Sequence, residues 1–122
     1  MSEQREIRFS REFVQKFKGL QKTYRQIEDD LHPLLDQLRN GETPGEQIPG
    51  VGRPVYKVRL TNRSAKSGKR GGFRVLYYLQ TASSIYLITV YSKTKRENIG
   101  VNEIKRLLNE VDETPNQPPD NP

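Results

Sequence analysis

The chain has 122 residues, of which 21 are Lys or Arg and 15 are Asp or Glu, and its formal net charge is +6 at pH 7. It contains no cysteine, which excludes disulfides and thiolate metal sites. No apolar run reaches the roughly 18 to 20 residues needed to cross a bilayer, and the charged start lacks the apolar segment of a signal peptide. We therefore expect a cytoplasmic protein with no membrane partner.

The positive charge narrows the choice of partner. A small basic domain usually meets nucleic acid, an anionic membrane or an acidic protein, although excess Lys can also serve solubility alone. Nucleic acid is favoured here, because the cations gather on predicted strands and in one hairpin. The mean hydropathy of −0.89 is low for a free-standing domain of this size and indicates a polar tail or a surface that a partner covers.

The N-terminal part of the chain predicts a short strand followed by a helical hairpin. Residues 6–9 form the strand, and Ser10 is a good N-cap for the first helix. A second helical pattern runs from about residue 23 to residue 38, and we expect Pro33 to kink or briefly break it. The first helix has an apolar stripe at helical spacing, made of Phe13, Phe17, Leu20 and Tyr24.

The middle of the chain changes from helical to strand periodicity. Residues 42–54 are rich in Gly and Pro and predict a loop. Residues 55–61 alternate as a half-buried strand does, and Lys57 and Arg59 fall on the face opposite the apolar side chains. A long basic hairpin loop is expected over residues 62–72.

The remaining elements complete an α+β fold. Residues 73–80 and 85–91 are apolar enough to be central strands, and residues 101–111 have the apolar side of a helix. The predicted order is β-α-α-β-β-β-α, with the last three strands as an antiparallel meander. We expect one domain over residues 1–111 and a disordered tail, rich in Pro and Asn, over residues 112–122.

The segment with the densest group of candidate site residues is 66–74, KSGKRGGFR. It has four cations and three glycines and leads directly into a predicted strand. Glycine lets a backbone approach a ligand closely, and Arg can hold a phosphate with two parallel N–H bonds. It is not a Walker A loop, because a strand follows it. If Arg74 and Lys93 share the face of Lys57 and Arg59, one surface carries several cations and the Tyr91 phenol. A slip of one residue in the register would reverse that face.

Such a surface suits RNA cleavage by attack of the 2′-hydroxyl on the adjacent phosphorus. Fixed cations would meet the negative charge of the transition state, while a base and an acid transfer protons. The sole histidine, His32, lies in the helical hairpin, so a lysine with a lowered pKa or a tyrosine would have to act instead. With no Cys and one His, we expect no metal or other cofactor. The alternative is that the cations are ordinary solvated residues and that the glycines only turn the chain. Packing is favoured over base stacking for the tyrosines of these strands, although one that faces outward could stack: Tyr77, Tyr78, Tyr86 and Tyr91.

Three segments together resemble the RelE/ParE superfamily of toxins from type II toxin–antitoxin systems: VYKVRL at residues 55–60, GKRGGFRVLYY at residues 68–78 and IYLITVYSK at residues 85–93. The Gly-Lys-Arg-Gly-Gly-x-Arg and Tyr-x-Lys motifs are most similar to the HigB branch. The resemblance covers about residues 5–111 and implies a small α+β fold with two N-terminal helices packed on an antiparallel sheet. It implies an mRNA interferase, an endonuclease that cuts codons in the ribosomal A site without a metal. It also implies a cognate antitoxin as a partner, besides the ribosome and mRNA.

The resemblance implies catalytic roles by position for Lys57, Arg59, Arg74, Tyr91 and Lys93. A second set of basic loop residues is expected to bind RNA or phosphate: Lys66, Lys69, Arg70, Lys95 and Arg96. Some RelE toxins place a catalytic tyrosine in or near the last helix, whereas residues 98–101 offer none here, so the general acid and base stay unassigned. A gyrase-inhibiting toxin of the ParE branch and a non-catalytic RNA-binding module are the alternatives.

Overall fold

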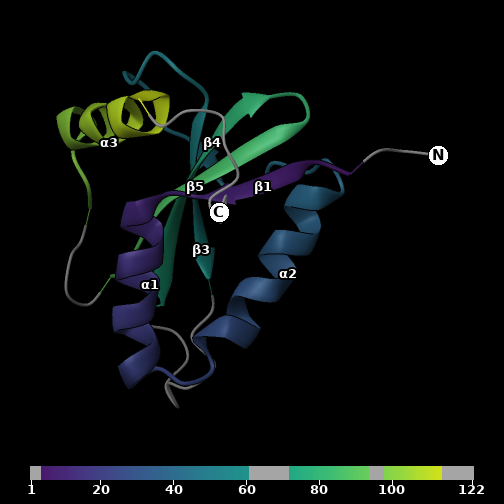
Figure 1. Cartoon of the computed structure of the whole chain (residues 1–122), viewed down its shortest axis with the longest axis vertical. Coiled ribbons are helices and arrows are strands. Elements are labelled where there is room, and N and C mark those ends of the chain that lie inside the picture. Colours follow the sequence, from purple (N-terminus) through teal and green to yellow (C-terminus); the bar gives the residue numbers. More distant parts are fainter. Residues whose placement is uncertain (1–3, 61–71, 94–97, 114–122) are drawn as a thin grey trace.

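The computed structural model describes residues 4–60, 72–93 and 98–113. Over these ranges the chain folds into one five-stranded sheet, in the order β1-β5-β4-β3-β2, packed against three helices (Figure 1). The elements in chain order are β1 (Glu6–Phe9), α1 (Arg11–Thr23), α2 (Ile27–Arg39), β2 (Glu46–Gln47), β3 (Val55–Leu60), β4 (Phe73–Thr81), β5 (Ser84–Ser92) and α3 (Val101–Glu113). Among the described helices, none is long and apolar enough to cross a bilayer.

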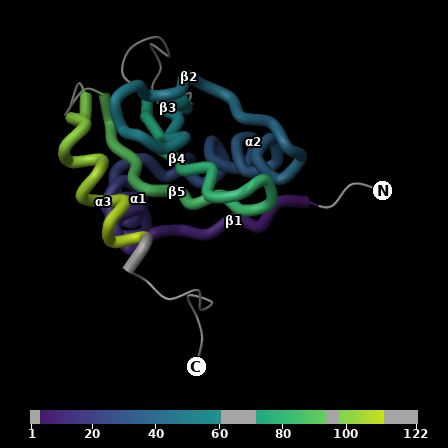
Figure 2. Tube along the Cα trace, turned by 90° about the horizontal axis from the view of Figure 1, so that it is seen from above, coloured from purple at the N-terminus to yellow at the C-terminus, as the bar shows by residue number. Residues whose placement is uncertain are grey.

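The two faces of the sheet are covered by different helices. On one face, α1 and α2 bury a core that includes Leu60, Val75 and Leu87. On the other face, α3 packs over Leu76 and Ile88. Both views place α2 and α3 on opposite sides of the molecule (Figures 1 and 2). Alternation along each strand therefore decides which side chains lie under the helical hairpin and which lie on the face that α3 covers only in part.

The helix α1 begins where Ser10 ends β1, as the sequence predicts. Ser10 Oγ accepts a hydrogen bond from the backbone N–H of Phe13 at 3.0 Å and donates one to the carbonyl oxygen of Ile88 at 2.6 Å. One hydroxyl therefore caps the first turn of α1 and ties that turn to β5. Glu12 lies in the same turn, where the helix dipole favours an anion, and accepts a hydrogen bond from the Thr89 hydroxyl at 3.3 Å.

The second helix differs from its prediction. It begins at Ile27, after a short turn, and runs to Arg39 with Pro33 inside it. Of the two predicted effects of Pro33, a kink or a short break, the break is therefore wrong. Proline removes one backbone hydrogen bond from a helix. The buried side chains of α2 compensate, because they pack in the core beneath the hairpin: Ile27, Leu31, Leu34, Leu35 and Leu38.

The sheet gains two features that the sequence pattern does not show. The strand β1 pairs with β5 in parallel, at the edge of an otherwise antiparallel sheet. The two-residue strand β2 lies inside the predicted loop and pairs with β3. Gly45, just before β2, has φ of +94°, and a Cβ there would collide with the carbonyl oxygen of Lys57. Glycine is thus what lets this segment approach the sheet.

The structure allows only some of the predicted boundaries to be compared, because it describes part of the chain. The helix α3 runs to Glu113, two residues beyond its predicted end at Val111. Residues 114–122 of the predicted disordered tail lie outside the described ranges, as do residues 62–71 of the predicted hairpin loop and residue 61 at the end of the predicted strand.

Candidate nucleic-acid interface

Three of the predicted site residues lie in one row across three neighbouring strands. Arg59 on β3 is directly opposite Arg74 on β4, and Arg74 is directly opposite Tyr91 on β5. Residues in such positions have Cβ atoms about 4.5 to 5.5 Å apart. We call these three residues the cationic row. Two like charges placed this close favour an anion that both can contact.

The cationic row lies on the face of the sheet that α3 covers in part. Arg74 alternates along β4 with Phe73 and Val75, which are both fully buried in the core beneath α1 and α2. Its side chain therefore points to the other face, together with Leu76 of the α3 core. The strand register therefore places Arg59, Arg74 and Tyr91 on one face of the sheet, a point that the sequence pattern left open.

Gly72 lies beside the cationic row, two residues before Arg74, and allows two backbone segments to pack closely. Its φ is +66°, and an added Cβ would lie 2.8 Å from the carbonyl oxygen of Leu60 and 3.5 Å from Nε of Arg59. The backbone N–H of Lys93 donates a hydrogen bond to the carbonyl oxygen of Gly72 at 3.1 Å, which places Lys93 beside the same glycine. The absence of a side chain at this position is what lets its backbone lie this close to the Leu60 carbonyl oxygen, with the Arg59 side chain in contact beside it.

Lys57 shares the face but has a different neighbour. It lies two residues before Arg59 on β3, roughly 7 Å away along the strand. The register puts it directly opposite Glu46 of β2. A carboxylate in that position favours a cross-strand pair with lysine. Lys57 therefore has an acidic neighbour across the strands, whereas Arg59 is opposite another arginine.

Tyr91 is the largely buried member of the cationic row. Its side chain is 9% exposed and packs with Ile99 and Ile104, in the cluster that α3 forms on the sheet. The helix α3 therefore controls how much of the Tyr91 phenol a ligand can reach.

A second tyrosine group on the same face was missed by sequence reasoning. Tyr78 of β4 is directly opposite Tyr86 of β5. The Arg53 guanidinium lies 5.7 Å from the Tyr78 ring centre, and the Arg8 guanidinium lies 5.9 Å from that of Tyr86. No local pattern links arginines 45 positions apart, so only the register could reveal this group.

Tyr77 has a structural role on the opposite face. Its hydroxyl donates a hydrogen bond to the carbonyl oxygen of Pro44 at 2.6 Å, and its ring stacks on Tyr56 with centres 5.2 Å apart. Burial raises the pKa of the Tyr77 phenol well above its ordinary value. Tyr77 is thus a packing residue, as the sequence interpretation favoured.

The other predicted contacts are less defined. His32 is exposed on α2, away from the cationic row. In the part of the chain that the structure describes, no three His, Asp or Glu side chains gather to hold a metal ion. Five predicted RNA-binding residues lie outside the described ranges: Lys66, Lys69, Arg70, Lys95 and Arg96.

Comparison with known proteins defines the fold class. No family model matches the chain. Among solved structures, the sheet and helices are similar to those of a RelE-like toxin, which confirms the predicted α+β class. That structure is the E. coli toxin RelE, an arginine-to-alanine double mutant in the free state. The match has a TM-score of 0.54 and 20% sequence identity and covers 84% of this chain and 97% of that one.

Proposed function

We propose that this chain is the toxin of a type II toxin–antitoxin system and acts as a ribosome-dependent mRNA endonuclease. The observation that carries the proposal is the placement of Arg59 directly beside Arg74 on one face of a RelE-like sheet, with Tyr91 next in the row. Two adjacent guanidinium groups suit a phosphodiester, because each can donate two parallel N–H bonds to its oxygens. The net charge of +6 strengthens attraction to an RNA backbone.

The proposed reaction is an internal transfer at phosphorus. The 2′-oxygen forms a bond to the adjacent phosphorus while the bond from phosphorus to the 5′-oxygen breaks, which leaves a 2′,3′-cyclic phosphate and a 5′-hydroxyl. Arg59 and Arg74 stabilise the negative charge that gathers on the non-bridging oxygens. One group takes the 2′-proton and another protonates the 5′-oxygen. Tyr91, at one end of the row, and Lys93, two residues farther along the chain, are the first candidates for these roles, and Lys57 is the next.

The finer assignment is to the HigB-like branch. The Gly-Lys-Arg-Gly-Gly-x-Arg segment that ends at Arg74 and the Tyr-x-Lys segment that ends at Lys93 support it. In this assignment the protein works in the cytoplasm on ribosome-bound mRNA, without a metal, and a cognate antitoxin inhibits it. The basic loop residues expected to bind RNA keep that role here.

The deciding experiment supplies mRNA with and without translating ribosomes and measures gyrase supercoiling in parallel. Cuts with codon periodicity that appear only with ribosomes support the proposal. Loss of supercoiling without mRNA cuts would assign the chain to gyrase-inhibiting toxins instead. RNA binding that weakens with salt, without any cleavage, would make it a binding module.

Arg74→Ala tests the row itself. We expect the cleavage rate to fall by about a hundredfold or more, because a positioned donor to the transition state is lost. Arg39→Ala is the matched control, since Arg39 lies at the end of α2 and pairs on the surface with Asp36 at 3.5 Å. The control should keep its activity, and circular dichroism should show both variants folded. Full activity in the Arg74→Ala protein would remove Arg74 from the mechanism.

A further inference from the structure

The strand β5 carries one extra residue just beyond the segment that pairs with β1. Leu87 is the last residue of that segment and is directly opposite Tyr77 of β4. The preceding residue of β4, Leu76, is directly opposite Thr89, so Ile88 is the extra residue. Such a β-bulge bends a strand and changes the direction of the side chains beyond it.

The bulge decides which face of the sheet Tyr91 occupies. Beyond the bulge, Tyr91 is directly opposite Arg74. Without the extra residue, the pairing that starts at Leu87 would place Val90 opposite Arg74 instead. Tyr91 would then be opposite Phe73, on the face that is buried beneath α1 and α2. The bulge is therefore what brings the Tyr91 phenol into the cationic row.

The first turn of α1 is hydrogen-bonded to the bulge. The backbone N–H of Ser10 donates a hydrogen bond to the carbonyl oxygen of Leu87 at 3.0 Å, and Ser10 Oγ donates one to the carbonyl oxygen of Ile88 at 2.6 Å. The Thr89 hydroxyl donates a hydrogen bond to Oε2 of Glu12 at 3.3 Å. Thr89 is 3% exposed, so this carboxylate satisfies a hydroxyl that water hardly reaches. Each residue from 87 to 89 is thus linked to α1.

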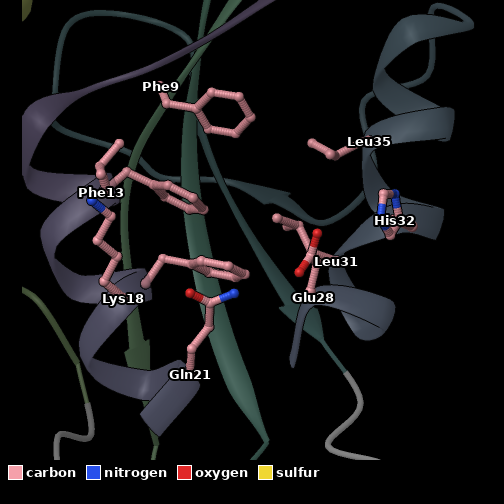
Figure 3. Close-up of a pocket in the computed structure, with 10 residues that line it drawn as sticks. Phe9, Phe13, Lys18, Gln21, Glu28, Leu31, His32 and Leu35 are labelled. Atoms are coloured by element: carbon pink, nitrogen blue, oxygen red, sulfur yellow. The ribbon is translucent and has the colours of Figure 1, made fainter. Parts of the chain in front are cut away.

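Phe13 fixes this turn of α1 in the core. Its side chain is 2% exposed and points toward the hollow between α1 and α2 (Figure 3). The centre of its ring lies 5.5 Å from that of Phe9 and 5.6 Å from that of Phe17. Its backbone N–H donates the capping hydrogen bond to Ser10. The turn that contacts the bulge therefore has a fixed place, because closely packed cores resist displacement.

We propose that Ser10, Glu12 and Thr89 are positioning residues. They keep the bulge in place and so hold Tyr91 opposite Arg74. The inference rests on the proposed function, in which Tyr91 is a candidate for proton transfer. It adds to that function the residues, remote from the arginines in the sequence, that hold the phenol in line with them.

The Thr89 hydroxyl opposes movement of the bulge in two ways. A bulge that moved along β5 beyond Tyr91 would put Thr89 directly opposite Val75, on the face buried beneath α1 and α2. The shift by one residue, about 3.3 Å, would break the hydrogen bond to Glu12. The hydroxyl would also be buried among apolar side chains. A valine at position 89 suits that buried face and cannot donate the hydrogen bond, so it should favour the moved bulge.

The test measures the position of Tyr91 by NMR in the full chain, with labelled tyrosine rings and isoleucine methyl groups. In wild type, the Tyr91 ring should give nuclear Overhauser signals to the methyl groups of Ile99 and Ile104, which share its apolar cluster. Thr89→Val should weaken these signals about twofold or more, because the population with the moved bulge rises. Thr89→Ser keeps the hydroxyl and should retain them.

Glu12→Ala tests the same hydrogen bond from the other side. It should weaken the Tyr91 signals as Thr89→Val does, and the double variant should resemble either single one, since both remove one interaction. Thr81→Val is the matched control, because it removes a threonine hydroxyl at an exposed position at the end of β4. It should leave the signals unchanged. Undiminished signals in both Thr89→Val and Glu12→Ala would overturn the proposal. Should Thr89→Val fail to fold, Glu12→Ala decides the matter by itself.

Cleavage assays separate this inference from the proposed function. With translating ribosomes, Thr89→Val should lower kcat about tenfold or more and change KM less than about twofold, because a misplaced group costs rate rather than binding. If wild type does not cut mRNA but the Tyr91 signals follow the expected order, the proposed function fails and the positioning of Tyr91 stands. If Arg74→Ala loses cleavage while Thr89→Val cuts as wild type does despite weakened signals, the proposed function stands and a role of the bulge in catalysis is overturned.

Discussion

Gly72 and Gly52 share a left-handed backbone but differ in their surroundings. Their φ angles are +66° and +84°. A Cβ at Gly52 would meet nothing within 4 Å, whereas one at Gly72 would lie 2.8 Å from the Leu60 carbonyl oxygen, which is a collision. Alanine at the two positions therefore separates the cost of the backbone conformation from the cost of a collision beside the cationic row.

We expect Gly52→Ala to lower the free energy of unfolding by about 1 kcal/mol, the usual cost of a left-handed residue with a Cβ. Gly72→Ala should cost roughly 2 kcal/mol or more, because a collision adds to the same strain. Urea unfolding measures the two losses. Equal losses would show that the strand relaxes around the new methyl group.

At the scale of the elements, the Ser10 hydroxyl caps α1 and links its first turn to β5. Ser10→Ala removes both the cap on the Phe13 N–H and the hydrogen bond to the Ile88 carbonyl oxygen. We expect a loss of about 1 to 2 kcal/mol in the free energy of unfolding. Ser10→Thr keeps the oxygen and should lose less. The urea midpoint should fall with an unchanged slope, and an unshifted midpoint in Ser10→Ala would show that the cap contributes nothing.

At the scale of the whole molecule, the buried Tyr77 phenol links stability to pH. Its folded-state pKa is raised by burial, whereas in the unfolded chain a tyrosine titrates near about 10. The folded state thus favours the neutral phenol. Its contribution is complete below about pH 10 and is lost as the pH rises from there toward the folded-state pKa.

Tyr77→Phe should remove this pH dependence. At neutral pH the variant should lose about 1 kcal/mol, because the hydrogen bond to the Pro44 carbonyl oxygen is gone. Above about pH 10 its stability should fall less steeply than that of wild type. Urea unfolding across this pH range compares the two proteins. Parallel curves would mean that Tyr77 does not govern the alkaline loss.

The order and approximate bounds of the main elements follow from the sequence alone. Ser10 marks the start of α1, and period-two alternation identifies β3 with Lys57 and Arg59 on one face. These features act within a few residues, so local patterns suffice to predict them. The resemblance to RelE-like toxins likewise rested on short motifs, and the comparison with a solved structure confirms the fold class.

Other features needed contacts between distant parts of the chain. Packing of α2 on the sheet keeps the helix continuous at Pro33, where local propensity predicts a kink or a break. Pairing of β4 with β3 and with β5 aligns Arg74 with Arg59 and Tyr91. Local sequence therefore determined which elements form and which side chains alternate. Register and helix placement came from long-range packing, because a strand's pairing partner and a helix's buried face are chosen only when the core assembles.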